Sequence, residues 1–216
     1  MTLRETHERL LDIAIAEFGA KGLEGASTRS IAAAAGTAMS SITYHYGGKE
    51  GLYLAAAQHI AERMAEEMGA AAIDAGDVAS ADPAQARVLL HRIIGAFVDR
   101  MTSDKSEAWT LFIIREQNRP TEAFDRIYGG LMGQMMEQLA ALILRVTGMA
   151  DEHRARAVTG TLIGQALVLR ASRAACLRLM RRETMDAELA ATFRAQIAQN
   201  TDAILDMLTA QAKEPA

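Results

Sequence analysis

The chain has 216 residues, of which 50% are hydrophobic and 23% are charged, and its formal net charge is −4. This length is enough for one large domain or for a small domain joined to a medium-sized one, and the composition is ordinary for a globular protein. The acidic balance argues against nucleic-acid binding by the surface as a whole, so a DNA-binding site requires a local stretch without acidic residues.

Several classes of site have no counterpart in the sequence. The five histidines lie far apart without the spacing of metal ligands, so we expect no metal ion and no cofactor. The absence of a glycine-rich phosphate loop and of a nucleophile motif argues against an enzyme. The longest apolar stretch, residues 157–169, is too short to cross a bilayer, so we expect no membrane partner.

The single cysteine, Cys176, cannot form an internal disulfide, which fits a reducing compartment and predicts a cytoplasmic protein. A lone helical cysteine is expected to be an inert core residue. A sensor of oxidants remains the alternative if neighbouring arginines lower the pKa of the thiol.

The pattern of the chain predicts an all-α fold. Only three prolines interrupt it, and few windows alternate apolar and polar residues. A first helix over residues 3–20 has an apolar stripe that includes Leu11, Ile15 and Phe18. Gly22 is placed to end this helix in the left-handed conformation.

The segment 27–52 is the most informative part of the chain. Ser27 or Thr28 can cap a second helix, Gly36 makes a turn, and a third helix covers residues 39–46. This order is the layout of a helix-turn-helix, which places its second helix in a DNA major groove.

The charge pattern supports this interpretation of the segment. No Asp or Glu lies between Gly25 and Lys49, and the third helix carries a run of hydrogen-bonding side chains. The alternative is that these short helices are only members of a larger bundle, although helices of this length are marginal in isolation.

Longer helices are predicted for the rest of the chain. Residues 69–81 are rich in Ala, Gly, Asp and Ser and are expected to form a mobile loop. Asp82, Pro83 and Gln85 have the pattern of a capping box at a helix start. The predicted ranges are 49–72, 83–101, 107–118, 121–146, 151–180 and 184–210, with Thr121, Asp151 and Thr184 at helix starts and Gly148 at a helix end.

The residues from Thr28 to Leu52 resemble the TetR family of bacterial transcriptional regulators. The motifs are Thr-Arg-x-Ile-Ala from Thr28, Ala-Gly from Ala35, Tyr-His-Tyr from Tyr44 and Gly-Gly-Lys-Glu-Gly-Leu from Gly47. The sequence from Ile42 to Tyr53 is most similar to that of the CecR-type branch, which has its own class of C-terminal domain.

The resemblance implies that the third helix reads DNA. Thr28 and Arg29 would hold phosphates at the start of the second helix, and Lys49 would do so at the start of the fourth. Base edges, thymine methyls and further phosphates would be contacted by Ala38, Met39, Ser40, Ser41, Thr43, Tyr44 and His45.

The sequence departs from the family pattern at three positions of this helix. Ala38 stands where the family often has a Ser that caps the recognition helix, so the cap is expected to be weaker. Thr43 replaces the usual Tyr or Asn, which changes the expected operator sequence, and Tyr46 replaces Phe.

One helix-turn-helix makes few base contacts, so we expect two copies at half-sites about one DNA turn apart. The resemblance implies a homodimer through the last two helices. The alternative is that the apolar faces of these helices pack only within one chain. The predicted interface residues are Gly160, Gly164, Leu167, Leu189, Phe193, Ile197, Ile204 and Leu208.

The middle of the chain holds half of the scarce aromatic residues and much of the methionine. Methionine suits adaptable apolar pockets, and the resemblance implies an effector pocket here. The alternative is that these residues are ordinary core. The predicted effector-binding residues are Phe97, Met101, Trp109, Phe112, Arg115, Glu116, Tyr128, Met132, Met135 and Met136.

We therefore expect residues 1–50 to form a helix-turn-helix DNA-binding domain and residues 51–212 a helical effector-binding and dimerisation domain. The expected function is a ligand-responsive repressor that binds an inverted-repeat operator in double-stranded DNA and is released by a small, mainly apolar molecule. One alternative is a DNA-binding regulator whose body binds a protein partner or no small ligand. The other is an all-helical enzyme with an incidental helix-turn-helix.

Overall fold

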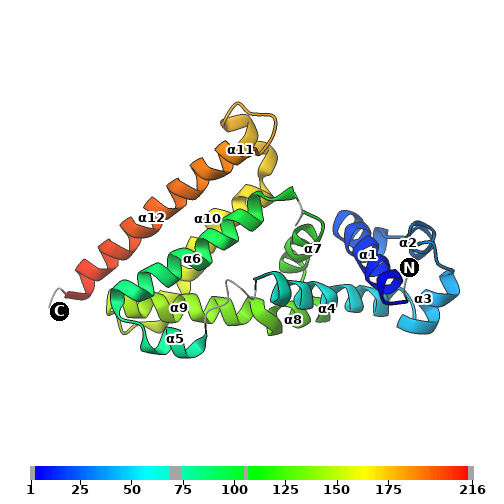
Figure 1. Cartoon of the computed structure of the whole chain (residues 1–216), viewed down its shortest axis with the longest axis horizontal. Coiled ribbons are helices and arrows are strands. Elements are labelled where there is room, and N and C mark those ends of the chain that lie inside the picture. Colours follow the sequence, from blue (N-terminus) through cyan, green and yellow to red (C-terminus); the bar gives the residue numbers. More distant parts are fainter. Residues whose placement is uncertain (1–2, 69–73, 105–106, 214–216) are drawn as a thin grey trace. The chain divides into compact units, whose positions relative to one another are not determined.

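The computed structural model describes residues 3–68, 74–104 and 107–213 (Figure 1). These residues form helices joined by short connections and include no strand, so the predicted all-α class is confirmed. No helix among the described residues is both long and apolar enough to cross a membrane. The chain divides into two compact units, each with contributions from separate parts of the sequence.

The first unit contains the N-terminal helices together with a later segment of the chain. Its elements are α1 (Leu3–Gly25), α2 (Thr28–Ala35), α3 (Met39–Tyr46), α4 (Lys49–Met68), α7 (Glu107–Asn118), α8 (Glu122–Ile127) and the π-helical segment η2 (Tyr128–Met132). Helices α1, α2 and α3 pack in sequence order, and α7 lies along α1.

Aromatic side chains form the centre of this unit. The ring of Tyr53 from α4 stacks on Phe112 from α7 with 4.6 Å between centroids, and it forms a T-shaped pair with Phe18 from α1 at a centroid distance of 4.9 Å. All three side chains are almost fully buried. Burial of aromatic rings contributes a large part of core stability. These contacts therefore hold α1 and α4 against α7.

A buried carboxylate adds a polar connection beside the aromatic rings. Glu116 is 2% exposed, and its Oε1 accepts a hydrogen bond of 2.6 Å from the hydroxyl of Tyr53. Its Oε2 accepts bonds from the backbone N–H and hydroxyl of Thr121 and from the backbone N–H of Phe124. A buried charge is tolerated when it is hydrogen-bonded in this way, so Glu116 fixes α4 and the start of α8 to α7.

The end of α1 differs from the prediction. Gly22 has the expected positive φ of 74°, but α1 continues through this kink to Gly25 instead of ending near Ala20. The end of α1 is held by tertiary contacts on both sides of this kink. The ammonium of Lys49 donates to the carbonyl of Glu24 at 2.9 Å, and the guanidinium of Arg115 donates to the carbonyl of Ala20 at 3.0 Å.

The second unit is a bundle of longer helices. Its elements are α5 (Ala75–Ser80), α6 (Pro83–Thr102), α9 (Gly133–Thr147), α10 (Glu152–Ala171), α11 (Arg173–Leu179) and α12 (Ala187–Lys213). Helix α6 packs against α9, α10 and α12, and its buried side chains include Leu90 and Ile94. The predicted capping box is confirmed, with Asp82 and Gln85 bonded reciprocally at the start of α6.

Charged side chains add to the contact between α6 and α12. Arg87 donates to Asp202 at 2.7 Å and to Asp206 at 2.5 Å, and the Nε2 of His91 lies 2.9 Å from the same oxygen of Asp202. The hydrogen bond with His91 and that with Arg87 lower the pKa of Asp202, although burial opposes them. The terminal helix is therefore held to the unit by ion pairs in addition to apolar packing.

Two of the predicted long helices are interrupted. The helix expected over residues 121–146 breaks at Gly130, whose φ of −85° and ψ of −145° are not helical, and α9 begins afterwards. Two consecutive glycines lower the helix propensity at this point. The helix expected over residues 151–180 breaks at Ser172, beside which Arg173 reaches across to the carbonyl of Thr102 and the carboxylate of Asp104.

Two further boundaries were predicted incorrectly. The last helix begins at Ala187 rather than after Thr184, because the carboxylate of Asp186 accepts a bond from the N–H of Leu189. Part of the expected mobile loop 69–81 is the helix α5, which is capped by Asp74. Residues 69–73 of that loop, which include the predicted end of the helix 49–72, lie outside the described residues.

The close approach of α1 and α7 yields a first prediction. A Cβ at Gly19 would lie 2.7 Å from the carbonyl oxygen of Ala108 and 3.2 Å from the backbone nitrogen of Phe112. Because backbone atoms cannot rotate away, Gly19→Ala should lower the free energy of unfolding by about 1–3 kcal/mol despite the better helix propensity of Ala. Chemical denaturation measures this change.

Gly129→Ala is the matched control, since a Cβ there meets no atom within 4 Å. It should change the free energy of unfolding by less than about 1 kcal/mol. Equal effects of the two substitutions would contradict the claim that α1 and α7 require a glycine at their contact.

Candidate nucleic-acid interface

Helix α2 and the turn after it form as the sequence predicts. The hydroxyl of Ser27 accepts a hydrogen bond of 3.2 Å from the N–H of Ser30, which caps the helix. Ile31 is buried on the side of α2 that packs against α1. Gly36 has a φ of 70° and donates its N–H to the carbonyl of Ala33, so the chain turns sharply into α3.

Helix α3 has one buried and one exposed face. Ile42 is 1% exposed and anchors the helix in the core of the first unit. The N-cap is Ala38, which makes no side-chain hydrogen bond, as the sequence predicts. Gly47 ends the helix with a φ of 75° and donates its N–H to the carbonyl of Thr43.

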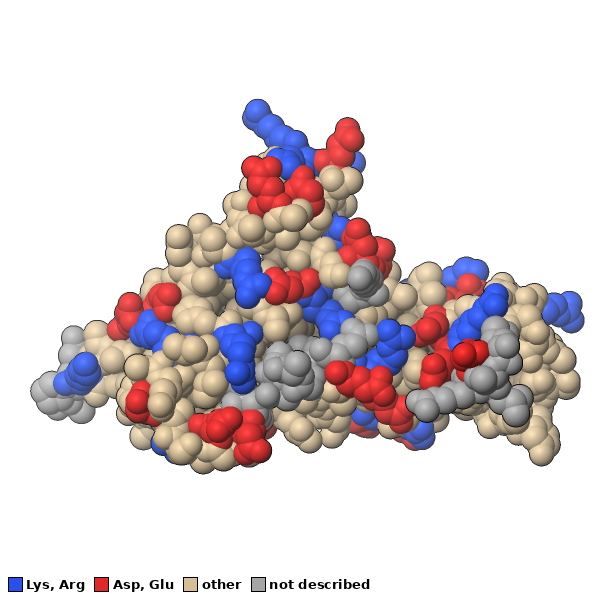
Figure 2. Space-filling view, in the orientation of Figure 1, with Lys and Arg blue, Asp and Glu red and all other residues tan. Residues whose placement is uncertain are grey.

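The predicted base-reading residues of α3 lie mainly on its exposed face. Tyr44 is 85% exposed and Met39 is 49% exposed, and only Ser41 among the set is half-buried. We call the exposed members Ala38, Met39, Ser40, Thr43, Tyr44 and His45 the reading face. On the side shown in Figure 2 the surface over α3 is tan, because this helix carries no Lys, Arg, Asp or Glu. A surface without carboxylates avoids repulsion from phosphates.

The predicted phosphate-binding residues differ in their surroundings. Arg29 is exposed in the first turn of α2, and Thr28 beside it is half-buried. Both lie at a helix N-terminus, where backbone N–H groups favour an anion. The ammonium of Lys49 already donates to the carbonyl of Glu24, so replacing it would disturb the end of α1 as well as any phosphate contact.

Two residues near this surface were missed by the sequence analysis, and both lie on α1. The Nδ1 of His7 is 3.0 Å from the hydroxyl of Tyr46, the last residue of α3. The guanidinium of Arg9 donates to the carbonyl of Ala34 at 3.3 Å. These contacts join positions 39 and 25 residues apart, and no local pattern in the sequence signals them.

The predicted effector-binding residues are divided between the two units. The first unit contains Trp109, Phe112, Arg115, Glu116, Tyr128 and Met132, and the second contains Phe97, Met101, Met135 and Met136. In the first unit, Phe112 and Glu116 are buried in the contacts with Tyr53, and Arg115 binds the carbonyls of Gly19 and Ala20. These three side chains therefore hold the helices of the unit together.

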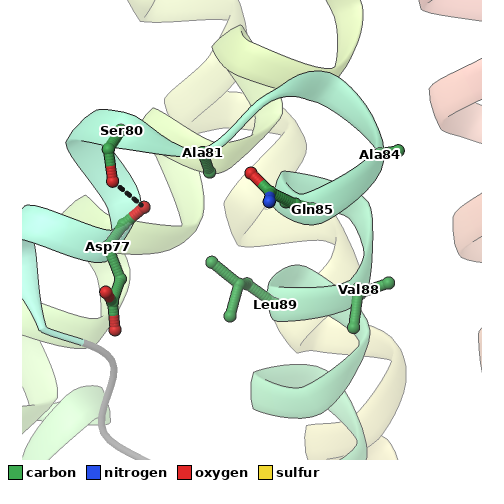
Figure 3. Close-up of a pocket in the computed structure, with 7 residues that line it drawn as sticks. All are labelled: Asp77, Ser80, Ala81, Ala84, Gln85, Val88 and Leu89. Atoms are coloured by element: carbon green, nitrogen blue, oxygen red, sulfur yellow. Dashed lines mark hydrogen bonds between the residues drawn. The ribbon is translucent and has the colours of Figure 1, made fainter.

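Cavities occur in both units. In the first, Trp109 helps to line one of about 260 Å³, and Arg115 helps to line another of about 360 Å³. In the second, a cavity of about 510 Å³ lies between α5 and the start of α6. Figure 3 shows Gln85 and Leu89 on the side of α6 that faces Asp77 and Ser80. The sequence gives no sign of this cavity, because the composition of residues 69–81 favours a loop where α5 forms.

The predicted interface residues of α10 and α12 fall into two groups. Gly160 and Gly164 are exposed, and a Cβ at either position meets no atom within 4 Å. Leu167, Phe193 and Ile204 are half-buried. Leu189, Ile197 and Leu208 are buried within the second unit, where α12 packs on α6 and α9, so their side chains are already covered in a single chain.

A helix-turn-helix with an exposed, acid-free second helix on an otherwise helical chain defines the class of DNA-binding transcriptional regulators. Residues 10–56 match the family of bacterial regulatory proteins of the tetR type. Residues 86–208 match the C-terminal domain of the HTH-type transcriptional dual regulator CecR. The HTH-type transcriptional dual regulator CecR of Shigella flexneri is 35% identical over 176 residues, which cover 79% of this chain and 78% of that protein.

The chain belongs to the TetR family of bacterial transcriptional regulators and to its CecR-type branch. Its relatives are DNA-binding regulators and not enzymes. Among solved structures, a TetR-like transcriptional regulator from Rhodococcus sp. RHA1 has a TM-score of 0.61 at 18% identity and covers 94% of this chain and 98% of its own. A second transcriptional regulator from Rhodococcus sp. Rha1 has a TM-score of 0.62 at 16% identity, with 91% and 96% covered. These two similarities support the fold.

The capping pattern of α2 and α3 gives the second prediction. Ala38→Ser supplies the missing side-chain cap and should stabilise α3 by about 0.5–1 kcal/mol, whereas Ser27→Ala removes the existing cap of α2 and should cost about 1 kcal/mol. Hydrogen exchange of the α2 and α3 amides reports each helix separately. Weaker protection of α2 in Ser27→Ala would show that the method detects a cap. If the protection of α3 were then unchanged in Ala38→Ser, the claim that α3 lacks a side-chain cap would be wrong.

Proposed function

We propose that this protein is a ligand-responsive repressor that binds an inverted-repeat operator as a homodimer. The observation that carries the proposal is the reading face of α3, which is exposed and uncharged while Ile42 anchors the opposite side. Residues 1–50 would bind DNA, and residues 51–212 would bind the effector and the second subunit. The protein would act in the cytoplasm, where its operator lies.

The DNA contacts would divide into two kinds. Thr28, Arg29 and Lys49 would position the protein on phosphates, and the reading face together with Ser41 would specify the sequence. Hydroxyl groups and the imidazole of His45 can both donate and accept hydrogen bonds, and Met39 can contact a thymine methyl. The lack of Lys or Arg on α3 supports readout of base edges by neutral groups.

Dimerisation would use the outer faces of α10 and α12. The exposed residues Gly160 and Gly164 allow a second helix to approach closely, and Val168 and Met207 on the same two helices are 43% and 49% exposed. Half-buried Leu167, Phe193 and Ile204 would complete the contact at its edges. Leu189, Ile197 and Leu208 would support these residues from within the subunit.

A small, mainly apolar effector would bind in the second unit, among Phe97, Met101, Met135 and Met136. These residues lie on α6 and α9, which pack against each other, and methionine adapts to ligands of varied shape. Of the predicted effector-binding residues in the first unit, Phe112, Arg115 and Glu116 are already used in contacts between helices. We therefore favour the four residues of the second unit. For release, the effector has to bind the DNA-incompetent conformation more tightly than the competent one.

Activation in addition to repression is the second candidate. The relative from Shigella flexneri is described as a dual regulator, which supports a protein able to do both. The direction of regulation would depend on where the operator lies relative to a promoter. A body that binds a protein partner instead of a small molecule would leave the DNA contacts unchanged.

The exposed Arg29 provides the third prediction. Arg29→Ala should weaken binding to duplexes of any sequence, and the salt dependence of the binding constant should fall by about one unit of slope for each phosphate that is no longer neutralised. Anisotropy titrations with a random-sequence duplex at several salt concentrations measure both quantities. Arg178→Ala, at an exposed arginine of α11, is the control and should bind as the wild type does. Wild-type affinity and slope for Arg29→Ala would contradict the phosphate role.

The exposed glycines of α10 provide the fourth prediction. Gly164→Arg should leave the subunit folded, because space around this position is open in one chain, but it should block the approach of a second copy. Sedimentation should then give a monomer with an unchanged helical circular dichroism spectrum. Ala65→Arg, on the exposed side of α4, is the control and should remain dimeric. A dimeric Gly164→Arg protein would exclude this face as the interface.

A further inference from the structure

The position of α3 depends on few contacts. The helix has eight residues, its N-cap makes no side-chain hydrogen bond, and Ile42 is its one fully buried side chain. A helix this short is marginal without tertiary support. Contacts near its ends therefore determine the direction in which the reading face points.

Tyr46 supplies such a contact at the C-terminal end of α3. Its hydroxyl lies 3.0 Å from the Nδ1 of His7 on α1, and the two rings stack with 5.7 Å between centroids and 21° between planes. A hydroxyl can donate to the unprotonated Nδ1 or accept from the protonated one, so the bond forms in either tautomer. Burial raises the pKa of Tyr46, which keeps its proton on the hydroxyl.

The ring contacts continue from Tyr46 into the reading face. The rings of His45 and Tyr46 form a T-shaped pair with 6.5 Å between centroids, and those of Tyr44 and His45 form another with 5.0 Å. His7, Tyr46, His45 and Tyr44 thus form one connected aromatic series from α1 to the most exposed aromatic ring of the unit. A shift of His7 or Tyr46 would be transmitted to two residues that we place at the DNA.

The hydroxyl of Tyr46 is what makes the hydrogen bond to His7. Phe, the residue of the TetR pattern given above at this position, cannot bond to an imidazole. Packing alone is satisfied by Phe, since the ring and not the hydroxyl stacks on His7. The hydroxyl of Tyr46 therefore bonds to the Nδ1 of His7 on α1. Phe at position 46 would leave this nitrogen without that bond.

We propose that His7, through its hydrogen bond to Tyr46, is a positioning residue that sets the orientation of the recognition helix and so contributes to the choice of DNA sequence. The inference rests on the proposed DNA contacts of the reading face. His7 itself need not touch DNA. Its role is to hold the last turn of α3, where Tyr44 and His45 lie.

The test compares specific with non-specific affinity. The probe is a duplex enriched from a randomised pool by the wild-type protein, and the reference is a random-sequence duplex of the same length. Tyr46→Phe and His7→Leu should each weaken binding to the enriched duplex by about threefold to tenfold, the effect of removing one hydrogen bond, while binding to the random duplex and its salt slope stay unchanged. The double variant should bind no more weakly than the weaker single variant, because both changes remove the same bond.

Rescue by a conservative variant separates positioning from general stability. His7→Gln keeps a side-chain hydrogen-bonding group, and His7 helps to line a cavity of about 530 Å³ between α1 and α4. With Tyr46 present, His7→Gln should bind the enriched duplex more tightly than His7→Leu does. In the Tyr46→Phe protein, His7→Gln should give no such gain. His153→Leu, at an exposed histidine of α10, controls for removal of an imidazole elsewhere.

The outcomes distinguish this inference from the proposed function. Suppose the wild-type protein enriches a specific duplex, and Tyr46→Phe and His7→Leu bind that duplex with wild-type affinity. The inference would then be wrong, and the proposed function would stand. Equal weakening on the enriched and random duplexes, with lowered melting temperature and no rescue by His7→Gln, would also overturn the inference, since the contact would then be structural only. If the wild-type protein enriched no duplex, the proposed function would fall and the inference with it.

Discussion

The contact between α1 and α7 is the constraint on which the first unit depends. Gly19 lets the two helices approach so closely that a methyl group would meet the backbone of Ala108. This approach brings Phe112 and Glu116 against Tyr53, the first large buried aromatic residue of α4. The three-helix arrangement that presents α3 is therefore completed by α7, a segment far along the chain. An isolated N-terminal fragment would lack that support.

The same contact explains why polar residues of α7 have structural roles. Arg115 binds the carbonyl oxygens of Gly19 and Ala20, and Glu116 accepts hydrogen bonds at both of its carboxylate oxygens. A buried carboxylate with all these donors in place is costly to disturb, because removing one donor leaves a desolvated charge behind. This arrangement fixes α7 to both α1 and α4. Because Arg115 and Glu116 are used in these contacts, we look for the effector in the second unit.

Local signals in the sequence predicted the helix-turn-helix and most of the helix caps. Ser27, Gly36 and Gly47 act through their own backbone and nearest neighbours, so one window of sequence is sufficient to recognise them. The breaks at Gly130 and Ser172 were missed, because apolar periodicity continues through both positions. The glycine pair at the first break is only a weak local signal, and the contacts of Arg173 beside the second are tertiary. The helix α5 was missed because a polar composition favours a loop while Val78 supplies an anchor in the core.

The candidate site divides in the same way between local and long-range information. The exposure of the reading-face residues could be predicted because they are adjacent in sequence and lack acidic neighbours, and their contacts with DNA stay a prediction. The contact of His7 with Tyr46 and the structural use of Glu116 could not, because their partners lie 39 and 63 residues away. The surfaces of α10 and α12 show a further limit, since an apolar stripe does not reveal which residues, such as Leu189, are already covered within one chain.

The proposed function requires two copies of α3 to read a symmetric DNA sequence. The decisive experiment is selection of bound duplexes from a randomised pool by the wild-type protein at physiological salt. We expect enrichment of an inverted repeat whose half-sites lie one helical turn of DNA, or a multiple of it, apart. Absence of any enriched sequence, with only weak and strongly salt-dependent binding, would contradict it.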